Sequence, residues 1–151
     1  MTSFPWTTTR AHVSKKSYDI LLAGFQIWTM EVEENKKGHI IEYNLESLVS
    51  FWFCAKINVE LTIKSIYKDG MLIGSESKSS SNRGSFFSKI KWTGKSYEVD
   101  SHTYKFDNTK SITYLIPFST VKFYFQEPKK GLNMISETYG LTSKIIEIEA
   151  H

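Results

Sequence analysis

The sequence predicts an all-β protein built on a strongly curved antiparallel meander sheet, a barrel or half-barrel of about eight to ten strands. In residues 57–67, apolar side chains such as Ile57 and Leu61 take every second position, and polar ones such as Glu60 stand between them. Turn signals such as Lys68-Asp69-Gly70 recur along the chain. Aromatic residues make up 15% of the 151 residues, and their rings suit pleated, half-buried surfaces.

The N-terminal third is predicted to hold two or three strands. Residues 18–32 carry apolar side chains on even positions and are interpreted as one long strand that bends at Gly24, where the missing side chain lets the sheet curl. A polar turn is expected at 33–38 and a second strand at 41–45. The nearly continuous apolar run 48–55 is either a fully buried strand or the approach to the strand that begins at Ile57.

The middle of the chain continues the meander with strands at 57–67, 71–77 and 86–92, separated by turns at 68–70 and 79–84. The serine-rich stretch 77–81 is typical of a loop tip. A turn at 93–95 leads to the shorter alternating segments 97–99, 104–106 and 112–116.

The C-terminal part is less regular. Residues 121–125 alternate like a strand, but Ser119 could instead cap a short helical turn there. The last two candidate strands, 132–139 and 142–149, are separated by Gly140. Residues 17–151 are predicted to form a single all-β domain, preceded by a flexible lead-in at 1–16.

Composition excludes several classes of function. The net charge of +3 comes from 19 basic and 16 acidic residues that are interspersed, which argues against a nucleic-acid surface. No stretch approaches the roughly 18 apolar residues that a membrane-spanning helix needs. Residues 1–16 lack the apolar core of a secretory signal, so either the chain stays in the cytoplasm or a native signal has been lost or replaced.

No catalytic or metal-binding constellation stands out, and we expect no enzyme activity, no metal and no cofactor. Cys54 is the only cysteine and stands among apolar neighbours, which is typical of a buried, inert thiol. The four histidines lack the spacing of local metal ligands. The least poor catalytic candidates are Asp19, Glu31 and His102, and we do not expect two of them to meet in one pocket.

The one positive indication of a site is the aromatic content of the predicted inward faces. In a curved sheet these rings could fill the interior or leave a pocket for an apolar ligand. The candidate ligand-binding residues are Trp28, Phe53, Trp92, Tyr97, Tyr114, Phe123 and Phe125.

Four segments together resemble the DUF6134 family of uncharacterised proteins from Bacteroidetes. They are YDILLAGFQI at residues 18–27, YKDGML at 67–72, IKWTGKSYEV at 90–99 and VKFYFQEP at 121–128. The resemblance runs from about residue 17 to the C-terminus. It implies an exported all-β protein of unassigned function in the periplasm or cell envelope, and it supplies no catalytic residues.

The chain departs from the family pattern at both ends. A polar segment at 1–16 stands where a signal peptide is expected. The resemblance also implies a further strand pair after 142–149, so we expect a C-terminal hairpin to be missing or supplied by a partner strand. The leading hypothesis is a non-enzymatic cell-envelope β-domain that holds a hydrophobic small molecule in its concave face. The alternative is an interaction or scaffold protein that pairs with a protein partner through an open sheet edge.

Overall fold

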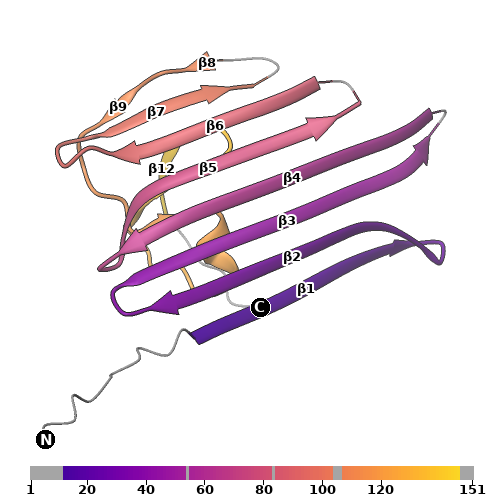
Figure 1. Cartoon of the computed structure of the whole chain (residues 1–151), viewed down its shortest axis with the longest axis horizontal. Helices are drawn as coiled ribbons and strands as arrows, with labels where there is room; N and C mark the ends of the chain where they lie inside the picture. Colours follow the sequence, from indigo (N-terminus) through magenta and orange to yellow (C-terminus); the bar gives the residue numbers. More distant parts are fainter. Residues whose placement is uncertain (1–11, 54, 83, 104–106, 147–151) are drawn as a thin grey trace, which may run out of the picture.

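A computed structural model describes residues 12–53, 55–82, 84–103 and 107–146, without the side chains of residues 22, 51–53 and 55. These residues form a nine-stranded sheet and a three-stranded sheet (Figure 1). From β1 to β8 the long sheet is a meander in which each strand is antiparallel to the preceding one, and β9 pairs with β7. Its strands are β1 (His12–Leu22), β2 (Phe25–Lys37), β3 (Ile40–Phe53), β4 (Ala55–Lys68), β5 (Met71–Ser81), β6 (Gly84–Trp92), β7 (Tyr97–His102), β8 (Asp107–Asn108) and β9 (Ser111–Ile112).

The prediction of an all-β antiparallel meander is confirmed. Both β8 and β9 pair with β7, at opposite halves of that strand. At the other side of the sheet, β1 pairs with β2. Within the described residues β1 and β8 do not pair with each other, so the sheet stays open rather than closing into a barrel.

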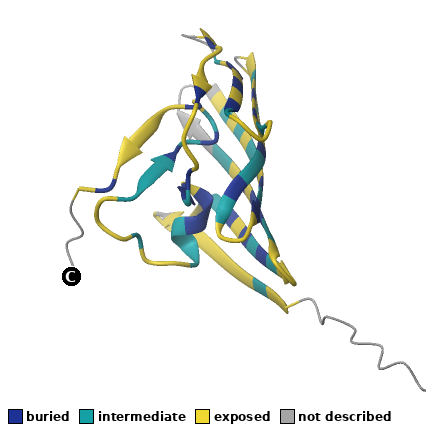
Figure 2. Ribbon diagram, turned by 90° about the vertical axis from the view of Figure 1, so that its left-hand side faces the viewer, coloured by how far each residue is buried: buried dark blue, intermediate teal, exposed yellow. Residues whose placement is uncertain are grey.

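The C-terminal residues form a second layer on one face of the long sheet (Figure 2). We call residues 113–146 the C-terminal cover. It contains β10 (Phe118–Ser119), the 3₁₀ helix η1 (Val121–Tyr124), β11 (Asn133–Ile135) and β12 (Thr142–Lys144). β10 is parallel to β11, and β11 is antiparallel to β12. Among the described residues, no helix is long and apolar enough to span a bilayer.

The first hairpin differs from the prediction of one bent strand over residues 18–32. The chain reverses at Ala23 and Gly24, which have φ angles of 52° and 82°. Positive φ at both central residues is what a two-residue type I′ hairpin turn requires. Gly24 is therefore part of a turn between β1 and β2, and the interpretation of residues 18–32 as a single strand is wrong.

Two neighbouring boundaries also move. β2 continues to Lys37, so most of the predicted turn at 33–38 is strand. β1 begins at His12, so the last residues of the predicted lead-in at 1–16 belong to the sheet, and residues 1–11 lie outside the described ranges. Hydrogen-bonded pairing with β3 and β2, respectively, extends both strands through polar sequence.

Further along, the apolar run at 48–55 supplies the end of β3 and the start of β4, so it is a hairpin and not one buried strand. The serine-rich stretch 77–81 is also strand, the second half of β5, and the loop-tip interpretation is wrong. At 121–125 the helical alternative is confirmed. The residue before this helix is Thr120, and its side chain makes no capping hydrogen bond, so Ser119 is not the cap.

Alternation along the strands divides the long sheet into two faces. We call the face under the C-terminal cover the inner face and the opposite one the outer face. Burial follows the predicted period of two, as in β7, where Tyr97, Val99 and Ser101 are buried and the residues between them are exposed. The hydrophobic core lies between the inner face and the C-terminal cover.

Candidate ligand-binding face

The inner face is made of rows of side chains that run across the strands, because each residue lies opposite its register partner. Two rows lie under the C-terminal cover, and we call them the covered rows. One consists of Val32, Leu45, Ile63, Ser77, Ser88, Ser101 and Asn108, and the other of Glu34, Tyr43, Ser65, Ser75, Ile90 and Val99. Every member of both rows is buried.

Tyrosine hydroxyl groups connect the sheet to the C-terminal cover. The Tyr67 hydroxyl donates to Ser119 Oγ at 2.5 Å. The Tyr97 hydroxyl donates to the Leu72 carbonyl at 2.6 Å and accepts from the Ile116 backbone N–H at 3.0 Å. Burial raises the pKa of both tyrosines, so both stay protonated and able to donate.

A buried glutamate holds the start of η1. Glu137 is 1% exposed and accepts from the backbone N–H groups of Thr120 at 3.0 Å and Val121 at 3.2 Å. Ser65 on β4 donates to the same carboxylate at 3.3 Å. Since a carboxylate compensates the free N–H groups at a helix start, Glu137 joins η1, β4 and the segment after β11. This residue has a structural role.

A second buried charge belongs to Lys122, a residue of η1 itself. Its Nζ donates to the Pro117 carbonyl at 2.8 Å and lies 4.5 Å from the ring centroid of Tyr67. Burial lowers the pKa of Lys122, and the charge of Glu34 partly opposes this shift. Glu34 pairs in register with Tyr43. Burial is the main cause that raises the pKa of Tyr43, and Glu34 raises it further.

A hydroxyl and an amide of the covered rows bind the backbone of residues 138–140. Ser101 donates to the Thr138 carbonyl at 2.9 Å, and Asn108 donates to the carbonyls of Tyr139 at 3.1 Å and Gly140 at 3.2 Å. Sequence reasoning missed these residues together with Glu137. The serines at alternate positions of β5 were an available signal, since they indicate a face that carries polar groups inward.

Next to the covered rows, two further rows of the inner face contain exposed and half-buried side chains, and we call them the open rows. The first crosses six strands and the second runs beside it toward the hairpins β1–β2, β3–β4 and β5–β6. Tyr18 and Ile20 are 38% and 42% exposed, and Val49, Val59, Leu61 and Phe86 are half-buried. The rows are Tyr18, Met30, Ser47, Leu61, Ser79 and Phe86, and then Ile20, Trp28, Val49, Val59 and Ser81. Within them Met30 and Ser47 are buried, and Tyr18 packs against Tyr124 of the C-terminal cover with ring centroids 5.7 Å apart.

The structure distributes the predicted aromatic residues over different places. Trp28 lies in the open rows, where its indole N–H donates to Ser47 Oγ at 2.6 Å. Trp92 and Tyr97 pack together in the core with ring centroids 4.7 Å apart. Phe123 and Phe125 belong to the C-terminal cover, and their rings lie 5.4 Å from Phe118 and 5.5 Å from Tyr43, respectively.

The two remaining members do not join them. Tyr114 lies between β9 and β10 and is 44% exposed. The side chain of Phe53 lies outside the described residues. The predicted rings therefore do not line one common surface, and Trp28 is the described member that faces the open rows.

The catalytic candidates lie on the outer face. Asp19 and Glu31 line one groove of about 620 Å³ together with Glu46 and Glu60, so two of the three candidates do meet, contrary to expectation. All four carboxylates are exposed to solvent. General acid–base catalysis is favoured by a site that excludes water, and this groove is open to solvent.

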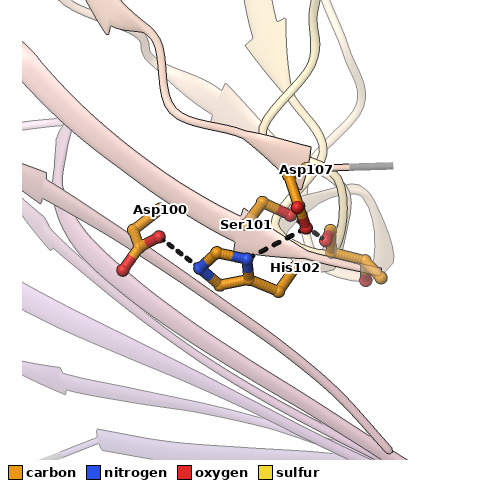
Figure 3. A network of polar contacts seen from close by, with 5 residues as sticks. Asp100, Ser101, His102 and Asp107 are labelled. Atoms are coloured by element: carbon orange, nitrogen blue, oxygen red, sulfur yellow. Dashed lines mark hydrogen bonds and ion pairs between the residues drawn. The ribbon is translucent and has the colours of Figure 1, made fainter. Parts of the chain in front are cut away.

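His102 lies far along the sheet, on β7, between two carboxylates (Figure 3). Its Nε2 is 2.7 Å from Asp100 Oδ1 and its Nδ1 is 3.0 Å from Asp107 Oδ1 on β8. The hydrogen bond with Asp107 and the charge of Asp100 raise the pKa of His102. Among the described residues, no cluster of three or more histidine, cysteine or carboxylate side chains could hold a metal ion.

Comparison with known proteins identifies one family. The model of a domain of unknown function, DUF6134, matches residues 18–151, which is nearly the whole chain. No curated protein matches the sequence. No solved structure matches it either.

Proposed function

The chain belongs to the DUF6134 family, a domain of unknown function, and from this premise we propose that it is a non-enzymatic β-domain that binds an apolar ligand on its open rows. The observation that supports this proposal is the incomplete covering of the inner face. The C-terminal cover buries the covered rows, whereas the adjacent side chains of Trp28, Val49 and Leu61 are left half-buried. A contiguous apolar surface of this kind is typical of a binding site.

The dimensions of the open rows suit a single acyl chain. The first row crosses six strands from Tyr18 to Phe86. Five steps of about 4.8 Å between strands give a length of about 24 Å. The row is thus longer than the acyl region of one bilayer leaflet, which is about 15 Å or half of the hydrocarbon core, and it is long enough to hold one acyl chain. The Ser79 hydroxyl, near one end of the first row, provides a polar group for the head of such a ligand.

Two neighbouring residues of β3 provide a matched test. Val49 belongs to the open rows, and Leu48 lies on the outer face with 49% of its surface exposed. We expect Val49→Ser to weaken binding of a fluorescent long-chain fatty acid about tenfold, because the apolar contact is lost. Leu48→Ser should leave the affinity unchanged. Equal effects of the two substitutions, or no binding by the wild-type protein, would contradict the proposal.

The site of action that we propose is the cell envelope, on the basis of family resemblance alone. Native mass spectrometry of protein purified from its own host would identify a bound lipid-like molecule. If the protein is recovered from the cytoplasmic fraction without such an adduct, this part of the proposal is wrong.

The alternative is an interaction protein that pairs with a partner through the edge of the sheet. β1 offers an 11-residue edge strand that pairs with β2 on one side. Lys15 and Lys16 lie in the middle of this strand, and charged residues at an edge oppose strand addition. Light scattering at several protein concentrations distinguishes the two functions, since strand pairing between copies would give a concentration-dependent mass.

A further inference from the structure

β1 is a long edge strand that carries exposed apolar side chains. Within the described residues it pairs with β2 alone, so the backbone groups along its other side have no strand partner there (Figure 1). Its 11 residues include no proline that would block a further strand. The large apolar side chains of β1 are 38–64% exposed, namely Val13, Tyr18, Ile20 and Leu21. An edge of this length and exposure is a surface to which another strand can add.

The lysines of β1 determine which strand can add. Lys15 and Lys16 oppose pairing with a strand of arbitrary sequence, because their charges would lie beside it without a partner. A second copy of β1, antiparallel to the first, is complementary when the pairing is centred on Ser17. In this register Lys15 of each copy lies opposite Asp19 of the other, and both residues belong to the outer face. Two pairs of opposite charge then face each other across the new ladder.

The other positions of this register also match. On the outer face Val13 lies opposite Leu21, which joins two exposed apolar side chains. On the inner face Lys16 lies opposite Tyr18. The Lys16 Nζ is held over that face because it donates to the Tyr124 carbonyl at 2.7 Å, so the tyrosine ring of the second copy meets the aliphatic part of the lysine. The match of charged and apolar positions along one strand points to a second copy of this chain as the occupant of the edge.

Neighbouring registers lack this match. A pairing centred on Lys16 brings Lys16 opposite itself, with two like charges in contact. A pairing centred on Tyr18 brings Lys15 opposite Leu21 and gives the lysine no partner charge. The side chains of β1 therefore favour the register centred on Ser17.

We propose that two copies of this chain form a symmetric dimer by antiparallel pairing of their β1 strands, centred on Ser17. The two-fold axis is perpendicular to the sheet, so both inner faces and both C-terminal covers lie on the same side of one continuous sheet. Pairing through the edges leaves both faces uncovered, and the open rows of the two copies stay accessible to a ligand. The dimer goes beyond the proposed function and is compatible with it, so a fatty-acid titration is needed beside the mass to separate ligand binding from a scaffold role.

Charge reversal at the paired positions tests the proposal, because two variants that fail alone should complement each other. Light scattering of the wild-type chain should show a mass that rises from one chain to two between about 1 μM and about 1 mM. Asp19→Lys brings two ammonium groups opposite each other, and Lys15→Glu brings two carboxylates opposite each other. Each variant should weaken dimerisation at least about tenfold, whereas an equimolar mixture restores opposite charges at both pairs and should associate within about threefold of the wild type.

A charge reversal away from the edge provides the matched control. Glu60 lies on β4 and lines the same outer-face groove as Asp19, and it is also exposed. Glu60→Lys changes the net charge as Asp19→Lys does and should dimerise like the wild type. Thermal melts should show that all variants are folded, and association in the mixture confirms this for the two edge variants.

Cysteine cross-linking tests the register, in a Cys54→Ser background because Cys54 is the only cysteine. Ser17→Cys should give a disulfide-linked dimer under mild oxidation, since residues directly opposite each other have Cβ atoms within reach of a disulfide. Ser14→Cys should give none. Ser14 lies opposite Ile20 in the proposed register, about 20 Å along the strand from its own counterpart.

A wild-type chain that stays monomeric up to about 1 mM overturns the proposal, and so does a mixture of the two edge variants that fails to associate. Equal weakening by Asp19→Lys and Glu60→Lys would place the contact elsewhere and overturns it as well. Cross-linking of Ser14→Cys in preference to Ser17→Cys overturns the register and with it the proposal. Absence of fatty-acid binding by the wild type would contradict the proposed function and leave the dimer standing.

Discussion

Successive inner-face residues of β4 differ in burial, although the alternation along the strand predicts the same environment for both. Ile63 is 5% exposed and lies under the C-terminal cover, whereas Leu61 belongs to the open rows and is half-buried. The period of two predicts the face on which each side chain lies. The extent of burial depends on where the C-terminal cover ends, and no residue of β4 carries that information.

Substitution of these two residues should separate the covered rows from the open rows. We expect Ile63→Ala to cost about 2–4 kcal/mol of unfolding free energy, since a buried side chain is lost and a cavity remains. Leu61→Ala should cost about half as much, because solvent already reaches it. Urea unfolding of both variants gives the comparison. Equal costs would mean that the open rows are as fully packed as the covered ones.

Short elements are held by particular side chains, and β8 is an example. Its two residues pair with β7, and His102 on β7 bonds to Asp107 on β8. Because the two carboxylates raise the pKa of His102, protonation of the ring stabilises the folded state. This contribution is fully present below the unfolded pKa of about 6.5 and is lost as the pH rises through the higher folded pKa.

We therefore expect the stability difference between wild type and His102→Gln to be largest below about pH 6 and to shrink at alkaline pH. Denaturant melts across this range measure the difference. An NMR titration of the His102 ring should give a pKa above that of a free histidine. A difference that grows with rising pH would mean that the ring is neutral in the folded protein.

The contact between the C-terminal cover and the sheet depends on one glycine. Gly140 has a φ of 66°, and a Cβ atom at this position would overlap Val99 Cγ1 on β7. Gly131 also has a positive φ, of 87°, but has nothing within 4 Å of the same point. We expect Gly140→Ala to cost about 1–3 kcal/mol more than Gly131→Ala, because only Gly140 combines backbone strain with a clash.

Thermal or urea unfolding of the two glycine variants tests this expectation. The bond from Asn108 to the Gly140 carbonyl should weaken in the first variant, since β7 and the cover must separate. Similar costs for both substitutions would indicate that strain alone matters and that the cover can shift away from Val99.

At the scale of the whole molecule, the alternation of apolar and polar residues predicts the long sheet but does not predict the C-terminal cover. Strands β4, β6 and β7 follow from alternation, because each strand displays its own inner and outer residues. The hairpin at Gly24 escapes this reasoning for a geometric reason. The two-residue turn alone pairs even with odd positions, as it does Leu22 with Phe25, but the register shift between Ile20 and Leu21 restores the even–even match. Ile20 and Trp28 therefore face the same side whether the chain bends or reverses.

The candidate site was likewise predictable only in part from the sequence. Trp28, Val59 and Leu61 were recognisable as inward apolar residues, but their partial exposure was not, because the C-terminal cover contacts the sheet through residues distant in sequence. Ser65 and Glu137, for example, are 72 residues apart. Such contacts leave no periodic signal, and a buried glutamate looks like a surface residue until its backbone partners are known.

The serines of the covered rows also affect the order of events during synthesis. The meander pairs each strand with the one just made, so the sheet can form as the chain emerges. The C-terminal cover is made last, and until then the inner face has only water against it. The hydrogen-bond partner of Tyr67, Ser119, is synthesised 52 residues later. A face made wholly of leucine and isoleucine would invite aggregation during this interval, whereas Ser75, Ser77 and Ser88 hydrate readily and keep the unfinished sheet dispersed.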